Sequence, residues 1–113
     1  MTDKKKNILL YSTVTLLSLI IIFFSFRLYK IDLRIPFQYH GDAPHVLVTA
    51  KTMIDSGWYL KNKFLAWPVG FQMYDFPLGD NNLNLLFIKI ITIFCRDASL
   101  SVNIFYLLTF ILT

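Results

Sequence analysis

Glutamate is absent from this chain, and charged residues of any kind are scarce. Of its 113 residues, 16% are charged and 56% are hydrophobic, and aromatic side chains alone make up 17%. Soluble domains usually carry about 25% charged residues. The shortage of charge excludes an ordinary soluble globular protein, and the surplus of aromatic residues indicates a surface that lies partly in lipid.

Cysteine is nearly absent as well, because Cys95 is the only one in the chain. A single thiol excludes an internal disulfide and a metal site of the CxxC type. The chain also lacks the phosphate-binding loop of P-loop enzymes, the HExxH motif of zinc proteases and the GxSxG motif of serine hydrolases. These residues require no cofactor, and Cys95 is expected to be a buried, inert thiol.

Acidic residues are too few to balance the basic ones. Eleven Lys and Arg stand against seven Asp, which gives a formal charge of +4 and raises the question of a nucleic-acid partner. The basic residues, however, are scattered along the chain, and Lys4, Lys5 and Lys6 stand beside an apolar segment, as topology signals do. The charge therefore predicts a membrane orientation and no nucleic-acid partner.

One long run, from Ile8 to Phe26, contains no charge, Pro or Gly. As a helix it would cover about 30 Å of hydrocarbon, and a helix is required because lipid offers no partners for backbone amides. A cleaved signal peptide is the competing interpretation, but the run is longer than such segments and no small-residue cleavage site follows it. Arg27, Tyr29 and Lys30 instead suit the interfacial end of an uncleaved transmembrane helix.

The positive charges on the two sides of this segment nearly balance, so its orientation depends on the loop that follows. Long polar loops translocate largely regardless of their charge. We therefore expect residues 1–7 to lie in the cytoplasm and residues 27–98 to form an extracytoplasmic loop.

All four prolines and all four glycines of the chain lie between Ile35 and Asn82, which predicts an ordered loop. Within it, Pro44 suits the first turn of a helix, Asp42 precedes that turn as a candidate cap, and Gly57 suits the helix end. Apolar residues at helical spacing predict an amphipathic helix near residues 44–56.

The remainder of the chain consists of an irregular segment followed by two apolar runs. Residues 58–82 are expected to form an aromatic loop near the lipid headgroups. A helix over residues 83–95 would reach only about 20 Å, and Lys89 interrupts it, so an interfacial or re-entrant helix is favoured over a spanning one. Residues 99–113 are predicted to begin a second transmembrane helix that is truncated here. The predicted fold is thus an all-α membrane protein.

Polar side chains that could bind or react with a substrate lie close together in the predicted extracytoplasmic loop. Asp42 stands between His40 and His45, and Asp75 and Asp80 follow in the aromatic loop. Each has a second interpretation, because Asp residues cap helices and form turns, and His residues are common in polar loops. The spacing of the two His and Asp42 is not diagnostic of a metal, so no metal site is predicted. We expect these five residues to bind a charged substrate at a membrane surface.

Three short motifs follow the N-terminal apolar segment: YHGDA at residues 39–43, GWY at 57–59 and YDFP at 74–77. In this order they resemble bacterial GT-C-type membrane proteins, which are multi-spanning glycosyltransferases and uncharacterised relatives that use polyprenyl-phosphate-linked sugars. The resemblance extends over nearly the whole chain and rests on its layout and on these motifs.

The resemblance implies an enzymatic function. In that family an Asp early in the first extracytoplasmic loop is the catalytic base, and Asp42 is the matching position. It also implies a bacterial inner-membrane location, with membrane lipid and a lipid-linked sugar as partners. Because the later loops that complete the family's site are missing, this piece alone is expected to be inactive.

Two points stay open at the level of sequence. The leaving polyprenyl phosphate needs cationic partners, and Lys51, Lys61 or Lys63 are candidates, although each is also typical of a solvated surface lysine. The alternative function is a non-catalytic membrane transporter or assembly subunit, whose loop would bind a partner through three aromatic residues, Trp58, Trp67 and Phe71.

Overall fold

The computed structural model describes residues 3–74 and 82–112, which form four helices and one pair of short strands. The chain divides into two compact units. The first unit comprises residues 1–32 and 107–113, and the second comprises residues 33–106.

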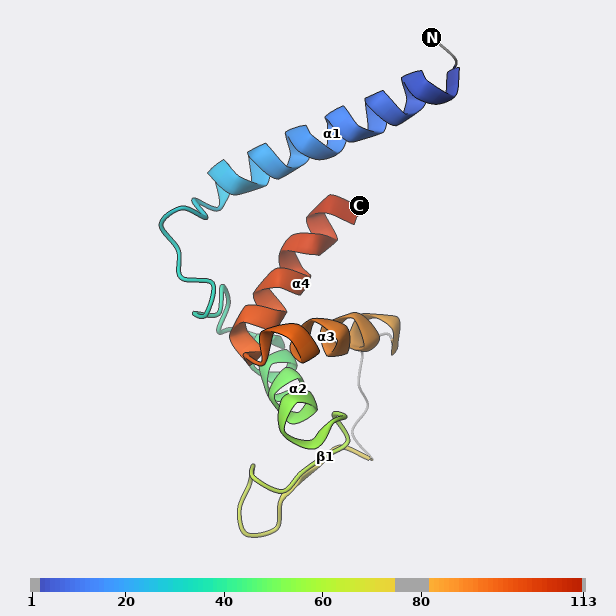
Figure 1. The fold of residues 1–113 in the computed structure, drawn as a ribbon. Coiled ribbons are helices and arrows are strands. Elements are labelled where there is room, and N and C mark those ends of the chain that lie inside the picture. The colour runs from blue at the N-terminus through green and yellow to red at the C-terminus, as the bar shows by residue number, and fades with distance from the viewer. Residues whose placement is uncertain (1–2, 75–81, 113) are drawn as a thin grey trace. The chain divides into compact units, whose positions relative to one another are not determined.

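The first unit is dominated by α1 (Asp3–Ser25), the long helix next to the N-terminus in Figure 1. None of its residues is buried, and its Leu, Ile, Val and Phe side chains are largely exposed. Among the described residues it is the one helix long and apolar enough to cross a membrane. The helix predicted for residues 8–26 is confirmed, and it starts earlier because the lysines before Ile8 are good helix formers and Asp3 suits a helix N-terminus.

A hydrogen-bonded turn around Arg27 ends α1. The Arg27 amide donates to the carbonyl oxygen of Phe24 at 3.1 Å, and the Leu28 amide donates to that of Phe23 at 3.0 Å. Arg27 has a φ of 50°, the left-handed conformation that follows many helices in this paired arrangement. The turn places the helix end within one residue of the predicted Phe26.

The second unit begins its regular structure with α2 (Ala43–Ser56), which confirms the helix predicted near residues 44–56. Pro44 lies in the first turn, where the missing amide proton has no helical partner to lose. Gly57 ends the helix with a φ of 87°, which a side chain would strain. The buried face of α2 consists of Thr49, Ala50, Thr52 and Met53.

The core of this unit lies where α3 (Asn82–Cys95) packs across α2 (Figure 1). Ala50 and Met53 of α2 meet Leu85 and Ile88 of α3, and each of these four side chains is at most 2% exposed. Half-buried apolar residues close the core around them: Val46, Tyr59, Ala98, Val102 and Phe105. The helix predicted over residues 83–95 is therefore confirmed as a helix.

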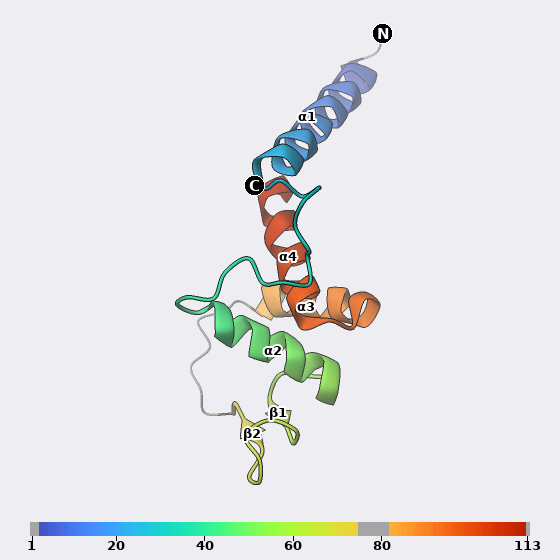
Figure 2. The same cartoon turned by 90° about the vertical axis from the view of Figure 1, so that its left-hand side faces the viewer.

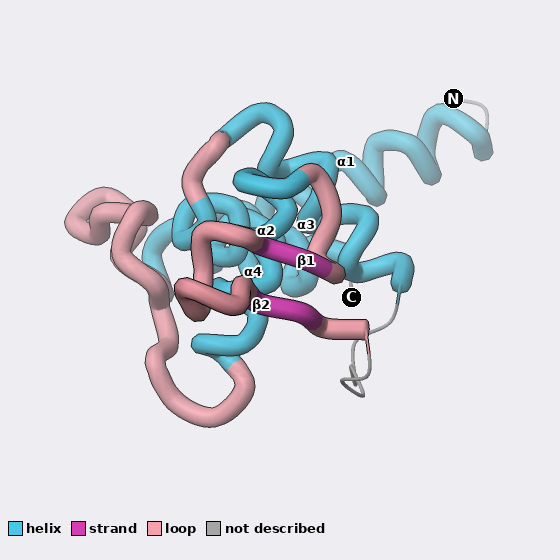
Figure 3. Tube along the Cα trace, turned by 90° about the horizontal axis from the view of Figure 1, so that it is seen from below, coloured by secondary structure: helices cyan, strands magenta, loops and turns pink. Residues whose placement is uncertain are grey.

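A short β-hairpin follows α2, where the sequence predicted an irregular loop. β1 (Lys61–Asn62) and β2 (Phe71–Gln72) are antiparallel, and Figure 3 shows them side by side. In both Figure 1 and Figure 2, α2 lies between α3 and this hairpin. The described residues are mostly helical, as the all-α prediction expects, and the hairpin is an element that was not predicted, because strands of two residues leave no alternating pattern in the sequence.

The last helix, α4 (Ala98–Leu112), begins in the second unit. Asp97 caps it, because its carboxylate accepts a hydrogen bond from the Leu100 amide at 2.8 Å. A helix over most of residues 99–113 is confirmed. However, α3 and α4 are both shorter than the length required of a membrane span, so a second transmembrane helix stays a prediction.

Asn103 fastens the segment before α2 to α4. Its side-chain amide nitrogen donates to the carbonyl oxygens of Leu33 at 2.8 Å and Ile35 at 2.7 Å, and its oxygen accepts from the Phe37 amide at 3.1 Å. The side chain is 2% exposed, so all of its hydrogen bonds must come from the protein. Residues 33–37 therefore have a fixed path although they form no helix or strand.

Candidate functional site

Asp42 stands at the N-terminus of α2, in a tight turn. The Ala43 amide donates to the His40 carbonyl oxygen at 3.4 Å, and Gly41 within the turn has a φ of 62°. The helix then starts from the Asp42 carbonyl oxygen, which accepts from the Val46 amide at 3.1 Å. The sequence of this turn therefore positions Asp42 as the last residue before α2.

The carboxylate of Asp42 does not cap the helix that it precedes. Capping residues usually adopt an extended backbone, from which the side chain turns back to the free amides of the first turn. Asp42 instead has helical angles, φ −82° and ψ −6°, and makes no side-chain cap hydrogen bond. The residue is exposed. Its carboxylate is therefore presented to solvent beside the positive end of the helix dipole.

The two histidines near Asp42 lie in different surroundings. His40 is exposed in the turn, whereas His45 is half-buried in the first turn of α2, where its carbonyl oxygen accepts from Thr49 Oγ1 at 2.9 Å. Within residues 3–74 and 82–112, no three His, Cys, Asp or Glu residues form a group that could hold a metal ion. The other two predicted substrate-binding residues, Asp75 and Asp80, lie outside the described residues.

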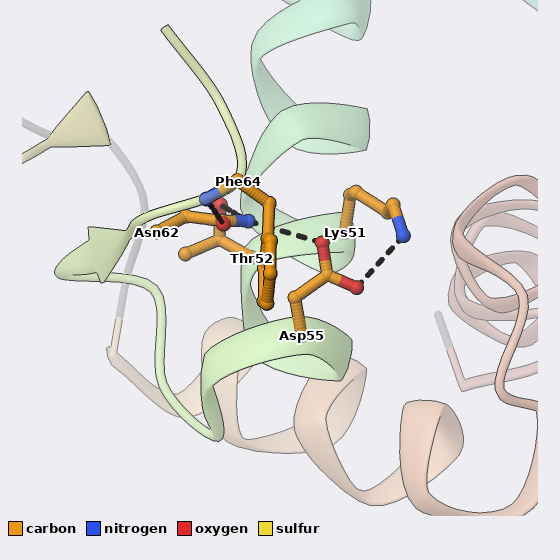
Figure 4. Close-up of polar contacts among 5 residues, drawn as sticks. All are labelled: Lys51, Thr52, Asp55, Asn62 and Phe64. Atoms are coloured by element: carbon orange, nitrogen blue, oxygen red, sulfur yellow. Dashed lines mark hydrogen bonds and ion pairs between the residues drawn. The ribbon is translucent and has the colours of Figure 1, made fainter. Parts of the chain in front are cut away.

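A polar cluster joins the far end of α2 to the hairpin (Figure 4). The Asn62 side-chain amide donates to Asp55 Oδ2 at 3.2 Å and to Thr52 Oγ1 at 3.5 Å, and its oxygen accepts from the Phe64 amide at 2.9 Å. Asn62 is 0% exposed. Since a buried amide without partners is costly, these contacts fix β1 against α2.

Asp55 is the charged member of this cluster. Burial raises the pKa of Asp55, whereas hydrogen bonds from Lys51 and Asn62 and the positive charge of Lys51 lower it. The lowering effects together outweigh burial, so the pKa lies below its ordinary value of 3.8. Lys51 Nζ lies 2.7 Å from Asp55 Oδ1, one helical turn away. Of the three lysines proposed as phosphate partners, Lys51 is thus already paired, whereas Lys61 and Lys63 are exposed on the hairpin.

The outer face of α3 is apolar even though its inner face already forms the core. Lys89, the one charge in this helix, is half-buried and donates from Nζ to the Met53 carbonyl oxygen at 3.0 Å. The large apolar side chains exposed on α3 are Leu83, Leu86, Phe87, Ile90, Ile93 and Phe94, and the exposed polar residues, Asn82 and Asn84, lie in its first turn. A helix that is apolar on both faces is unusual on a surface that meets only water.

Sequence reasoning missed the residues that hold this unit together. Asp55 carried one detectable signal, because Lys51 precedes it by four residues and such pairs meet on a helix. The sequence holds no comparable signal for Asn62 and Asn103, since nothing in it distinguishes a buried Asn from an exposed one. Comparisons with family models, with curated proteins and with solved structures find no match to this chain. The functional proposal therefore rests on the chain's own residues and on the motifs described above.

Proposed function

We propose that the chain is part of a membrane glycosyltransferase that takes a sugar from a polyprenyl-phosphate donor, with Asp42 as the general base. The observation that supports this most directly is the exposed carboxylate of Asp42. The side chain of an Asp at this position ordinarily accepts a hydrogen bond from an amide in the first turn of the helix, whereas the Asp42 side chain makes no cap hydrogen bond to α2. The carboxylate is left available to a substrate.

The proposed reaction needs a base of this kind. An acceptor hydroxyl attacks the anomeric carbon of the donor sugar, and its proton passes to the Asp42 carboxylate as the new C–O bond forms. The bond between the anomeric carbon and the phosphate oxygen breaks, and polyprenyl phosphate leaves with the bonding electrons. The substrate-binding roles proposed for His40 and His45 follow from their place on either side of Asp42 in the chain.

A lipid-linked donor requires the site to stand at a bilayer, and two features support that placement. We propose that α1 spans the bacterial inner membrane, since it is long, apolar and unburied. We also propose that α3 lies along the membrane surface, because its exposed face is apolar and it is too short to span. The second unit would then present Asp42 on the extracytoplasmic side.

The alternative function, a transporter or assembly subunit, has less support from these residues. It depends on Trp58, Trp67 and Phe71 forming one binding surface. Trp58 is 37% exposed and packs against Tyr59 with the rings tilted by 52° and their centroids 5.1 Å apart, and Phe71 is half-buried in β2. Trp67 is the one member of the three that is almost fully exposed, at 85%.

A direct assay separates the two functions. Membranes from cells that express the protein from its own gene would be incubated with a panel of radiolabelled polyprenyl-phosphate sugars and with endogenous acceptors. The proposal predicts transfer from one donor that is absent from membranes of the deletion strain. Equal transfer by both membranes with every donor would contradict the enzyme and favour the non-catalytic alternative.

A further inference from the structure

The tip of the hairpin between β1 and β2 carries three of the most exposed large apolar side chains described in the second unit. Trp67 is 85% exposed, Val69 is 81% exposed and Phe64 is 66% exposed. All three lie on the short connection between the strands. Large apolar side chains grouped at one exposed turn indicate a surface that is covered in use.

The hairpin lies on the side of α2 opposite to α3. Ala50 and Met53 of α2 pack against α3. Thr52 and Asp55 of the same helix accept hydrogen bonds from Asn62 of β1. Thus α2 separates the hairpin from α3, as Figure 1 and Figure 2 show. With the outer face of α3 on the membrane, as proposed above, the tip is directed away from lipid, and its ligand comes from water.

The side chains around the tip are aromatic and polar but carry little charge. Residues 64–74 contain no charged side chain. Gln72 lies opposite Lys61 in the hairpin, and both are exposed. Because successive side chains of a strand alternate between its faces and Asn62 is buried toward α2, Lys61 and Gln72 face away from α2. This outer face presents an amide and an ammonium group on the same hairpin as the exposed rings.

These groups match the chemistry of a neutral sugar. The C–H face of a pyranose packs on a flat aromatic ring such as that of Trp67, and its hydroxyl groups both donate and accept hydrogen bonds. The side-chain amide of Gln72 can do the same. A stable protein interface involves about 20–30 residues on each side and is depleted in lysine, whereas the tip has three large apolar side chains beside Lys61 and Lys63. A glycan therefore fits the tip better than a protein partner.

The tip is held in a defined conformation rather than being a free loop. The Gly70 amide donates to the Ala66 carbonyl oxygen at 3.0 Å, and the Phe64 amide donates to Asn62 Oδ1 at 2.9 Å. Asn62 in turn is buried against α2 (Figure 4). The exposed rings are therefore presented without the entropy loss that ordering a flexible loop would require.

We infer that this tip is a binding site for the acceptor of the proposed reaction, and that the acceptor is an extended neutral glycan. Asn62 is bonded to Asp55, which follows Asp42 by 13 residues, so the hairpin begins about 20 Å from Asp42 along the axis of α2. Only an acceptor several sugar residues long can contact Asp42 and Trp67 together. The inference rests on the proposed function, because it names the acceptor class of that reaction.

The first experiment measures glycan binding apart from sugar transfer. Glycans are released by mild acid from the cell envelope of the organism that carries the gene, and a fraction longer than six sugars is titrated by calorimetry into the whole protein. The protein is purified in a detergent without a sugar headgroup. The long fraction should bind, and Trp67→Ala should weaken binding about tenfold, whereas Trp67→Phe, which keeps a ring, should weaken it less.

Two further variants make the binding result specific. Gln72→Ala removes the amide of the same hairpin and should also weaken binding. Tyr11→Ala is the matched control, since Tyr11 is an aromatic residue of α1 that is 71% exposed, and it should bind glycan like the parent protein. Equal affinity of Trp67→Ala and the parent protein would overturn the inference. So would a parent protein that binds no glycan fraction but is cross-linked to another protein through Val69→Cys in a Cys95→Ala background.

Transfer assays distinguish this inference from the proposed function. Trp67→Ala should raise the KM for long acceptors about tenfold with little change in kcat. The KM for acceptors of one or two sugars should change less, because these cannot contact Asp42 and Trp67 together. Glycan binding that depends on Trp67 without any sugar transfer would contradict the proposed enzyme and leave the binding site intact. Sugar transfer with the same KM for long acceptors in Trp67→Ala and the parent protein would contradict the site and leave the enzyme intact.

Discussion

The ammonium group of Lys89 donates a hydrogen bond to the carbonyl oxygen of Met53 at 3.0 Å. Met53 lies in the last turn of α2, where a cation complements the negative end of the helix dipole. The charge that interrupts the apolar sequence of α3 therefore fastens α3 to α2. It is a structural contact of the core rather than a polar break in a helix.

We expect Lys89→Met to destabilise the second unit by about 1–3 kcal/mol, because the substitution keeps the length of the side chain but leaves the Met53 carbonyl without this donor. Thermal unfolding of the purified protein in detergent, followed by circular dichroism, measures the loss. Lys61→Met is the matched control, since Lys61 is exposed, and should change stability by less than about 0.5 kcal/mol. Equal effects of the two substitutions would contradict a specific role for Lys89.

Asn103→Leu should release residues 33–37 from α4. The substitution removes three hydrogen bonds, including the one that the Phe37 amide donates in a partly buried position, at a cost of about 2 kcal/mol or more. Hydrogen exchange of the Phe37 amide should accelerate, while exchange of the core amides of α3 changes less. Asn84→Leu, at an exposed position, serves as the control. Unchanged protection of Phe37 in the Asn103 variant would show that the three bonds do not hold this segment.

Asp55 should make the second unit sensitive to acid. Its pKa in the folded protein is lowered below 3.8, so its carboxylate stabilises the fold above that pH, and this stabilisation is lost as the pH falls through the lowered value. Asp55→Asn should therefore be less stable than the parent protein near neutral pH, and the difference should shrink as the pH falls below about 4. Unfolding midpoints of both proteins, measured from neutral pH to below pH 4, test whether the stability difference shrinks in acid.

A difference between the two proteins that grows with acid would contradict this assignment. Asp42→Asn is the control for the carboxylate-to-amide change, because Asp42 is exposed and makes no cap hydrogen bond. Its unfolding midpoint near neutral pH should fall by less than that of Asp55→Asn, because it loses only the exposed charge beside the helix N-terminus.

The proposed orientation can be tested by labelling single cysteines in a Cys95→Ala background. Tyr39→Cys, at a side chain that is 59% exposed, should react with a membrane-impermeant maleimide in intact cells. Lys5→Cys should react only after the cells are opened, because residues 1–7 are expected in the cytoplasm. The reverse pattern would invert the topology and remove Asp42 from the extracytoplasmic face.

The helices were predictable because each has a strong local signal. An uninterrupted apolar run marks α1, and Pro44 and Gly57 mark the ends of α2. The hairpin and the contacts of Asn62, Lys89 and Asn103 were not predictable, since they depend on residues that are distant in sequence. Lys89 lies 36 positions from Met53, and Asn103 lies 66 positions from Phe37.

The candidate site was predictable only in part. The sequence placed Asp42 directly before α2, and the structure agrees, but the sequence could not distinguish a capping side chain from an exposed one. That difference depends on the backbone angles of Asp42 and on the turn at Gly41, which a motif does not specify. The roles proposed for Asp75 and Asp80 stay predictions, because both lie outside the described residues.

The most direct test of the proposed function is the rate of sugar transfer by the Asp42→Asn variant, measured in membranes with the donor identified by the panel assay. The amide keeps the size of the side chain but cannot accept the proton of the acceptor hydroxyl, so transfer should fall by about 10² or more. The variant should still insert and accumulate normally, and Asp32→Asn, at another exposed Asp, should transfer sugar at the parent rate. Near-normal transfer by Asp42→Asn would contradict its role as the base.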